Sequence, residues 1–207
     1  MYKVMIVENQ AMPRQLMESV INQSDEFECV YSIESSAMAE VYCMNNNIDL
    51  ILMDICTAMN ESGLVAAKEI KIKYPKIKII MITSMPEYTY LERAREANVE
   101  SFWYKEISNI SILEVMQRTM NGESVYPDST PVVELGNAKS IDFTDKELEV
   151  LKQLTSGDSD TEIAQTLNMS VWTVRTHVKH LLEKTGFTSR TRLAVAARES
   201  GIVILGY

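Results

Sequence analysis

The sequence contains few of the residues that hold small disulfide-rich or fibrous proteins together. Its 207 residues include only three cysteines, seven glycines and five prolines. Cys29, Cys43 and Cys56 are widely spaced and form no CxxC pair, so neither a disulfide framework nor a zinc site is predicted. The low glycine and proline content excludes collagen-like and low-complexity chains. A reducing cytoplasm is the simplest compartment for such a chain.

Long uncharged hydrophobic segments are also missing. The N-terminal segment reaches Glu8 after a few apolar residues, too few for the hydrophobic region of a signal peptide. No uncharged run approaches the ~18 residues that cross a membrane. We therefore expect a cytoplasmic protein without a membrane partner. With 46% hydrophobic and 24% charged residues, the chain is typical of globular proteins, and its length allows one large domain or two small ones.

Basic residues are outnumbered, because 20 Lys and Arg oppose 29 Asp and Glu for a net charge of −9. Such a balance argues against a nucleic-acid partner, since phosphate backbones attract basic surfaces. The charge is distributed unevenly, however. Residues 1–122 carry −6 and residues 123–140 carry −2, whereas residues 171–207 carry +4. This asymmetry indicates a local polyanion-binding surface, with a solvated helix face as the alternative.

Short apolar runs alternate with segments of helical period over roughly the first 120 residues. We predict strands at Tyr2–Val7, Phe27–Ile33, Ile48–Met53, Ile77–Thr83 and Val99–Tyr104. We predict helices at Pro13–Gln23, Ser36–Met44, Gly63–Tyr74, Tyr88–Ala97 and Ser108–Asn121. The third and fourth strands are almost continuously apolar, which indicates strands covered on both faces. Repeated β–α units of this kind imply an α/β domain with a doubly wound parallel sheet.

Polar residues follow the predicted strands at the ends where ligands bind in doubly wound sheets. They are Glu8, Asn9, Asp54, Thr83 and Lys105. Hard oxygen ligands suit Mg²⁺, and the backbone carbonyl of Cys56 is a further candidate ligand. If Asp54 attacks a phosphoryl donor, a divalent ion and Lys105 would offset the charge, and the Thr83 hydroxyl could hydrogen-bond the product. The structural alternative is that Asp54 caps the next helix and pairs with Lys105.

The periodic pattern stops between residues 123 and 140. Prolines and small polar residues there favour extended or turn backbone over packed elements, so we interpret this segment as a domain linker. Beyond it, Thr144 and Glu147 form a predicted capping box. A short helix at Asp160–Leu167, a turn capped by Ser170 and a basic helix at Val171–Thr185 follow. Two helices joined by about three residues, the second basic, are typical of a helix-turn-helix.

The basic helix is amphipathic. Its apolar side chains, Val174, Val178, Leu181 and Leu182, recur at helical spacing and can be buried together. Arg175 can pair with a guanine edge or a phosphate, and Lys179 lies on the same face. His177 and His180 are expected to pack or cap, because no third metal ligand accompanies them. The residues predicted to contact DNA are Trp172, Thr173, Arg175, Thr176, Lys179, Lys184 and Arg190.

Four motifs in the first half are Val-Glu8-Asn9, Leu-Met-Asp54-Ile, Met-Ile-Thr83-Ser and Phe102-Trp-Tyr-Lys105. They resemble the receiver domain of bacterial response regulators, over about residues 1–122. The resemblance implies a flavodoxin-like five-stranded parallel sheet in the order 2-1-3-4-5. It also implies roles for the site residues: Asp54 as phosphoacceptor, Glu8 and Asn9 as the metal-binding pair, Thr83 as switch hydroxyl, Phe102 as switch aromatic, and Lys105 as the phosphate-contacting cation.

The chain departs from the receiver pattern at three places. Glu8-Asn9 replaces two aspartates, and an amide is a poorer Mg²⁺ ligand than a carboxylate. Thr57-Ala58 replaces Met-Pro, with Gly63 one residue later than usual, and Glu106 replaces the proline after the lysine. The alternative function is therefore an atypical regulator that binds DNA without phosphorylation. An enzyme such as a flavodoxin-like protein or an aspartyl-phosphate hydrolase is disfavoured, because no glycine-rich loop follows the first strand.

The second half contains Phe143-Thr-Asp-Lys-Glu147, Thr161-Glu-Ile-Ala, Thr-Val-Arg175-Thr-His177 and Glu-Lys184-Thr-Gly, ending near Arg190. This string resembles the LuxR-type helix-turn-helix. Together the two halves are similar to the NarL/FixJ family of transcriptional response regulators, with a receiver at 1–122, a linker at 123–140 and a four-helix DNA-binding domain at 141–207. The resemblance implies that Val171–Thr185 is the recognition helix, that promoter DNA and a sensor histidine kinase are partners, and that the active protein is a homodimer joined through its last helix.

Overall fold

The computed structural model describes residues 1–45, 47–105 and 108–204. The described chain divides into two compact units. The first contains Met1–Ser84 and Thr89–Ser129, and the second contains Met85–Tyr88 and the chain from Thr130 onward. Glu106, which replaces the proline expected after Lys105, and the last three residues of the predicted DNA-binding domain lie outside the described residues. Within the described part of the chain, none of the helices combines the length and apolar character needed to span a bilayer.

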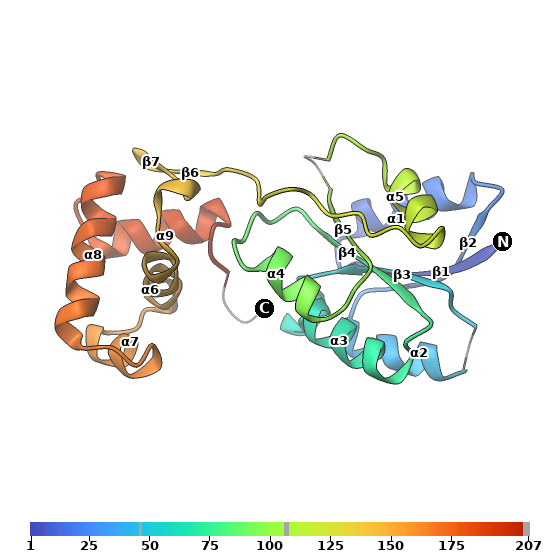
Figure 1. The fold of residues 1–207 in the computed structure, drawn as a ribbon, viewed down its shortest axis with the longest axis horizontal. Helices are drawn as coiled ribbons and strands as arrows, with labels where there is room; N and C mark the ends of the chain where they lie inside the picture. Colours follow the sequence, from blue (N-terminus) through green and yellow to red (C-terminus); the bar gives the residue numbers. More distant parts are fainter. Residues whose placement is uncertain (46, 106–107, 205–207) are drawn as a thin grey trace. The chain divides into compact units, whose positions relative to one another are not determined.

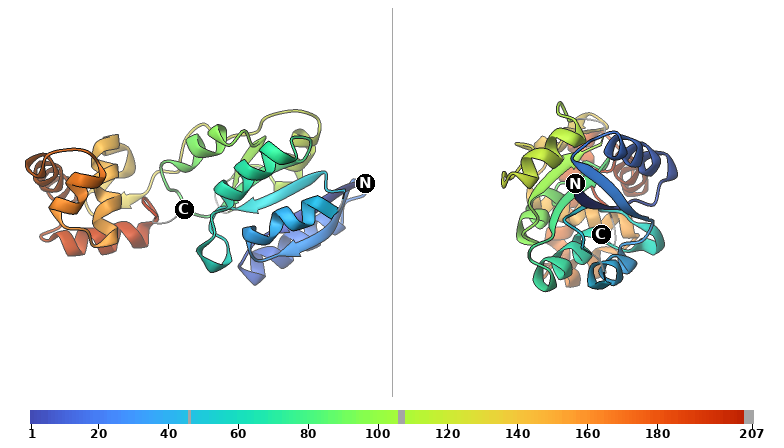
Figure 2. Two further views of the ribbon diagram at one scale, coloured as in Figure 1. Left: turned by 90° about the horizontal axis from the view of Figure 1, so that it is seen from below. Right: turned by 90° about the vertical axis from the view of Figure 1, so that its right-hand side faces the viewer.

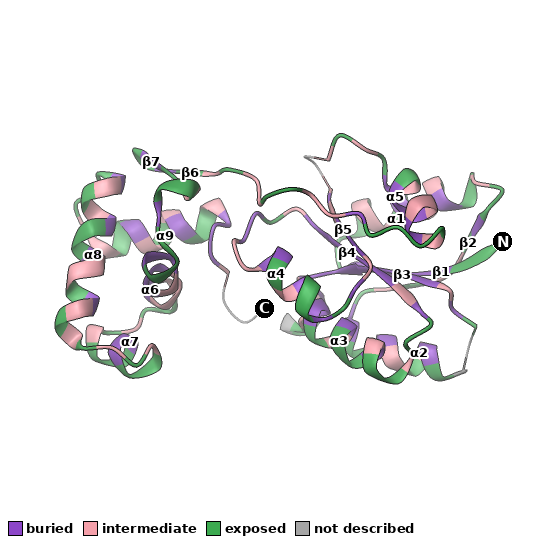
Figure 3. Ribbon diagram, in the orientation of Figure 1, coloured by how far each residue is buried: buried purple, intermediate pink, exposed green. Residues whose placement is uncertain are grey.

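The first unit is built on a five-stranded parallel sheet. Its strands are β1 (Tyr2–Val7), β2 (Phe27–Ile33), β3 (Leu50–Asp54), β4 (Lys78–Thr83) and β5 (Ser101–Tyr104). They lie in the order β2-β1-β3-β4-β5, and every pairing is parallel. This confirms the doubly wound α/β fold and its strand order. β3 is buried along its whole length (Figure 3), as a strand covered on both faces must be.

Helices cover both faces of this sheet. They are α1 (Ala11–Asn22), α2 (Ala39–Asn45), α3 (Gly63–Lys73), α4 (Tyr90–Glu96) and α5 (Ile112–Met120). Figure 1 and the right-hand view of Figure 2 show α1 and α5 on one face and α2 and α3 on the other. Ile21 of α1 and Val115 of α5 pack with Val4 and Leu50 in one apolar cluster. This face of the sheet therefore forms an apolar core with α1 and α5, and the polar residues lie at the ends of the strands.

Helix starts differ from the predicted ones where a side chain caps the helix. The last helix of the first unit was expected from Ser108, but it begins at Ile112 because the Ser111 hydroxyl accepts the Glu114 N–H at 3.1 Å. The predicted second helix begins as a 3₁₀ turn, Ser36–Met38, and becomes α-helical at Ala39. These shifts leave the order of the elements unchanged.

The second unit is helical. It contains α6 (Asp145–Ser156), α7 (Asp160–Thr166), α8 (Val171–Thr185) and α9 (Arg190–Ser200). Its core residues include Leu148, Leu151, Ile163, Val174, Leu181 and Leu193. The predicted capping box is confirmed, since the Glu147 carboxylate accepts the Thr144 N–H at 2.9 Å and the Thr144 hydroxyl accepts the Glu147 N–H at 3.3 Å. The Ser170 cap of α8 is confirmed likewise.

Part of the segment expected to be unpacked folds into the second unit. β6 (Glu134–Leu135) and β7 (Ala138–Lys139) form an antiparallel hairpin. Leu135 is 1% exposed and belongs to the helical core. At the turn, the Asn137 N–H donates to the Thr185 carbonyl at 2.9 Å, and a Cβ on Gly136 would lie 2.1 Å from that carbonyl. The expectation of extended chain without packing is therefore wrong for this hairpin, which closes onto the end of α8.

Candidate functional site

The carboxyl edge of the parallel sheet brings three charged side chains together. Glu8 follows β1, Asp54 ends β3 and Lys105 follows β5. The Lys105 ammonium donates to the Asp54 carboxylate at 2.9 Å and also to the Glu8 carboxylate. Both carboxylates are withdrawn from water, with 0% of Glu8 and 4% of Asp54 exposed. The strands thus place two acidic groups around one cation.

Burial dominates the electrostatics of this pocket. Loss of solvent raises the pKa of Asp54 from 3.8 to about 6, with Lys105 lowering it and Glu8 raising it by smaller amounts. Burial acts to lower the pKa of Lys105, but the two carboxylates outweigh it, so that pKa is raised. Two carboxylates and one ammonium leave an excess of one negative charge. The pocket is therefore suited to a further positive charge.

Thr83 on β4 and Phe102 on β5 are buried. Thr83 ends β4, and its carbonyl accepts the backbone N–H of Lys105 at 2.9 Å. The Phe102 ring centroid lies 5.0 Å from that of Tyr104 and 6.2 Å from that of Tyr126. The Phe102 N–H donates to the Val125 carbonyl at 2.8 Å. The predicted switch aromatic therefore contacts the chain just beyond α5.

The remaining predicted metal ligands lie on the loops around the pocket. Asn9 is exposed immediately after Glu8, and Cys56 lies two residues beyond Asp54, paired across its loop with Ser62. Among the described residues, no group of three or more His, Cys, Asp and Glu could hold a metal ion. The predicted donors are instead two buried carboxylates, an amide and a main-chain oxygen. These are hard oxygen ligands with surplus negative charge, which fits Mg²⁺.

The loop after Asp54 is closed by two contacts. The Thr57 hydroxyl donates to the Glu61 carbonyl at 2.8 Å and lies 2.9 Å from the Ser36 hydroxyl. At the start of α3, a Cβ on Gly63 would lie 1.9 Å from the Asp54 carbonyl oxygen. Only a glycine permits this approach of α3 to the backbone of Asp54. Thr57 and Gly63, two of the departures from the receiver pattern, therefore each make close contacts in this loop.

Sequence reasoning did not identify Arg14 as a neighbour of the pocket. Its guanidinium donates to the Glu8 carbonyl at 2.7 Å and to the Glu34 carboxylate at 2.9 Å. Arg14 lies on α1, whereas Glu34 follows β2, so the contact exists only once these elements have packed. Its position in the first turn of the helix that follows β1 is the only local signal of this arrangement.

We predict that Asp54 makes the first unit less stable as the pH rises. A carboxyl with a raised folded-state pKa is stabilising below its unfolded pKa, and this contribution is lost as pH rises through about 6. Between about pH 5 and about pH 7.5, the loss is about 1 kcal/mol. Urea unfolding followed by Trp103 fluorescence in a Trp172→Phe background, with chelator present, should show this loss. Asp54→Asn in the same background should remove it, and an equal pH slope in both proteins would contradict the assignment.

In the second unit, α8 carries an exposed polar face. Trp172 is 75% exposed, the Arg175 side chain is 70% exposed and Lys179 is likewise in solvent. Thr176 is half-buried, and Thr173 lies 2.8 Å from the Ser170 hydroxyl within the helix cap. Val174, Val178 and Leu181 are buried, as predicted.

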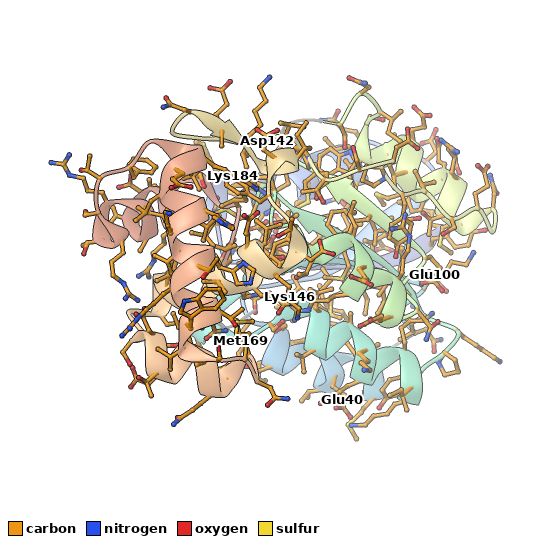
Figure 4. The ribbon with its side chains drawn as sticks, turned by 60° about the vertical axis from the view of Figure 1, so that its left-hand side comes forward. Glu40, Glu100, Asp142, Lys146, Met169 and Lys184 are labelled. Atoms are coloured by element: carbon orange, nitrogen blue, oxygen red, sulfur yellow. The ribbon has the colours of Figure 1, made fainter. Side chains whose placement is uncertain are left out.

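Three of the basic residues predicted to contact DNA, Arg175, Lys184 and Arg190, donate hydrogen bonds within the unit, and Arg175 donates to the Asp160 carboxylate at 3.1 Å. The Lys184 ammonium donates to the Glu147 carboxylate at 2.7 Å and to the Asp142 carbonyl at 2.8 Å, and Figure 4 labels Lys184 and Asp142 side by side. Arg190 donates to the Asp160 carboxylate and to the Asp158 carbonyl, each at 2.8 Å. Neither acidic partner was predicted from the sequence, because both contacts join residues far apart in the chain.

Comparisons with known proteins agree with the two-unit architecture. The family model described as "Response regulator receiver domain" matches residues 4–117, and the one described as "Bacterial regulatory proteins, luxR family" matches residues 142–197. The response regulator protein VraR of Staphylococcus epidermidis is 30% identical over 206 residues, covering 97% of this chain and 98% of the relative. VraR of Staphylococcus aureus matches to the same extent.

Solved structures share the fold. A structure of two RcsB dimers bound to two parallel DNAs matches with a TM-score of 0.64 at 20% identity, covering 94% of this chain and 97% of that chain. RcsB of Salmonella enterica serovar Typhimurium, bound to promoter rprA in the presence of the phosphomimetic BeF3-, matches with a TM-score of 0.62 at 19% identity, covering 96% and 98%.

A receiver domain followed by a LuxR-type helix-turn-helix domain defines a two-component transcription regulator, and the chain belongs to the NarL/FixJ family of response regulators. The family consists of regulators rather than enzymes, as expected from the sequence.

Proposed function

We propose that phosphorylation of Asp54 controls the binding of promoter DNA by α8. The observation that carries this proposal is the buried contact of the Asp54 carboxylate with Lys105 beside Glu8. We assign the receiver to residues 1–122, the linker to 123–140 and the DNA-binding domain to 141–207, acting in the cytoplasm. The end of this linker forms the β6–β7 hairpin, whose Leu135 and Ala138 pack on the core of the second unit.

In the proposed reaction, an Asp54 carboxylate oxygen attacks the phosphorus of a phosphohistidine on the sensor kinase. The new O–P bond forms as the P–N bond breaks, and the imidazole nitrogen keeps the bonding electron pair. Lys105 then donates to the transferred phosphoryl group, and the Thr83 hydroxyl is placed to do so from the neighbouring strand. Mg²⁺, held by Glu8, Asn9, Asp54 and the Cys56 carbonyl, would supply charge neutralisation.

The signal would leave the pocket through Thr83 and Phe102. Because Phe102 contacts Val125 and Tyr126, a change in its position would reach the start of the linker directly. We propose that the outcome is a homodimer, joined in part through α9. One basic helix provides limited affinity, and two linked copies raise it by effective concentration. Phosphorylation then needs only to change the population of the dimer or of the DNA-competent state.

DNA recognition would use the exposed face of α8. Arg175 and Lys179 lie on this face with Trp172 and Thr176, and a helix of this kind fits the major groove. The solved RcsB–DNA complexes support this use of the fold in a protein of the same class. The acidic remainder of the chain would repel DNA, so contact would be confined to this surface.

The experiment that tests the proposal is a footprint on fragmented genomic DNA of its own organism, made with and without acetyl phosphate and Mg²⁺. We expect protected sites in two half-sites, with occupancy that rises when the phosphodonor is present. If the same sites are occupied equally with and without the phosphodonor, the result would favour the atypical regulator. The specific argument for that alternative is the exposed Asn9, which replaces a carboxylate in the acidic pair. Absence of any preferred site would contradict DNA-directed function.

We predict that Arg175→Ala weakens binding to the footprinted site about 10- to 100-fold, because a bidentate arginine contact contributes about 1–3 kcal/mol of discrimination. The measurement is fluorescence anisotropy with a labelled site at fixed salt. Lys146→Ala, which removes an exposed cation of α6 outside this face, is the matched control and should bind as the unaltered chain does. Equal losses in both variants would mean that only total charge matters.

A further inference from the structure

An acidic side chain lies among the arginines of the proposed DNA-binding surface. Asp160, the first residue of α7, accepts a hydrogen bond from the Arg175 Nε at 3.1 Å through one carboxylate oxygen. Its other oxygen accepts from an Arg190 terminal nitrogen at 2.8 Å. One carboxylate therefore joins three helices, because Arg175 belongs to α8 and Arg190 begins α9. Burial acts to raise the pKa of Asp160, but the two guanidinium groups outweigh it and lower that pKa.

This contact does not have the character of a stabilising core interaction. The Arg175 side chain is largely in solvent, and exposed ion pairs contribute little to stability. A carboxylate on a surface that meets phosphates also weakens binding by repulsion and competes with phosphates for the arginines. The contact between Asp160 and Arg175 therefore has a cost for DNA affinity that its own contribution to stability does not offset.

The two arginines are held in different ways. Arg190 uses both terminal nitrogens within the unit, one on Asp160 and the other on the Asp158 carbonyl. Arg175 uses its Nε, on the inner edge of the guanidinium. The pair of terminal nitrogens of Arg175 remains directed away from that bond, and this is the pair that matches the O6 and N7 acceptors of guanine.

Resting on the function proposed above, we infer that Asp160 is a positioning residue that sets sequence specificity through Arg175. Arg190 fixes the Asp160 carboxylate, and Asp160 fixes the rotamer of Arg175 before DNA arrives. A guanidinium that is already oriented loses less conformational freedom on binding a base edge. A freely rotating Arg175 would pair with any nearby phosphate instead, which raises affinity without raising specificity.

The test compares Asp160→Asn with the unaltered full-length chain on two DNA fragments, the footprinted site and a fragment of the same composition in shuffled order. We expect affinity for the shuffled fragment to hold or rise and the specific-to-shuffled affinity ratio to fall about 10-fold. The slope of the logarithm of the binding constant against the logarithm of salt concentration should steepen by about one, because the released Arg175 can contact an additional phosphate. Asp158→Asn is the matched control, since it removes a neighbouring charge but keeps the carbonyl that binds Arg190.

A double-mutant cycle separates positioning from a structural role. In an Arg175→Ala background, Asp160→Asn should no longer change the affinity ratio, because its effect acts through Arg175. Asp160→Glu, which retains the charge, should restore part of the ratio. Circular dichroism and thermal unfolding of each variant report whether the fold is intact. If Asp160→Asn does not fold, Asp160→Glu takes its place in the double-mutant cycle.

Three results would overturn the inference while leaving the proposed function intact. The first is an unchanged affinity ratio in folded Asp160→Asn, and the second is an equal loss of the ratio with or without Arg175. The third is a fall of the ratio in Asp158→Asn equal to that in Asp160→Asn, which would show that local charge alone acts. A full-length chain that shows no preference for the footprinted site over the shuffled one would instead overturn the proposed function, and the inference with it.

Discussion

Asp54→Ala should abolish phosphorylation of the chain by acetyl phosphate in the presence of Mg²⁺. The Asp54 carboxylate supplies the attacking oxygen, and alanine has no atom that can take its place. Lys105 and Glu8 would still lie at the carboxyl edge of the sheet, but the proposal gives neither of them the role of phosphoacceptor. The measurement is intact-protein mass spectrometry, where the unaltered chain gains one phosphoryl group and the variant gains none.

The matched control for this change lies at the opposite end of the same strand. Asp49 immediately precedes β3, and its carboxylate accepts the Lys3 N–H at 2.8 Å, far from Lys105 in the sheet register. Asp49→Ala should be labelled to the same extent as the unaltered chain. Labelling that persists in Asp54→Ala would mean that the acceptor is misassigned. An unaltered chain that takes up no phosphate with Mg²⁺ would support the atypical regulator instead.

Glu147→Ala should destabilise the DNA-binding domain by about 2–3 kcal/mol, less than the loss for a fully buried ion pair, because the Lys184 side chain is 35% exposed. Glu147 is 3% exposed, and its carboxylate accepts from the Lys184 ammonium and from the Thr144 N–H. Burial acts to raise the pKa of Glu147, but Lys184 and Thr144 lower it overall. Alanine removes the carboxylate that accepts from both Lys184 and the Thr144 N–H, and Lys184 keeps only the Asp142 carbonyl, so α6 and α8 lose a shared contact.

Urea unfolding followed by far-UV circular dichroism, with the transition of the first unit recorded separately by Trp103 fluorescence in a Trp172→Phe background, measures this loss in the second unit. Glu149→Ala is the control, because Glu149 lies on the same helix and pairs with exposed Lys146 at 2.7 Å. An exposed pair contributes at most about 1 kcal/mol. Similar unfolding midpoints for the two variants would show that the Glu147–Lys184 contact does not hold α6 to α8.

Some of the helices and strands whose bounds depend on nearby residues were predicted correctly from the sequence. β1 and β2 have the predicted bounds, as does α8, because apolar periodicity and a serine cap act over a few residues. The sheet order followed from the motifs that resemble a receiver domain. The convergence of Glu8, Asp54 and Lys105 could be anticipated, since parallel strands present their carboxyl ends at one edge.

The contacts that sequence reasoning missed join distant elements. Asp160 meets Arg190 thirty positions later in the chain, and Glu147 meets Lys184 thirty-seven positions later. Nothing in the local pattern of either acid indicates its partner, because helix packing brings them together. The β6–β7 hairpin was missed for a different reason. Its two-residue strands are too short for a period of two to register, although Gly136-Asn137 between apolar residues is a recognised hairpin signal.

The approach of α3 to the Asp54 backbone gives position 63 a diagnostic value in sequence comparison. Any side chain there would overlap the peptide oxygen of Asp54. A relative that aligns another residue with Gly63 must route its loop differently, and a relative whose glycine falls one residue earlier has a loop one residue shorter before this helix. The presence and sequence position of this glycine can therefore be used to group related chains by the conformation of the loop after the residue aligned with Asp54, before any of their structures is determined.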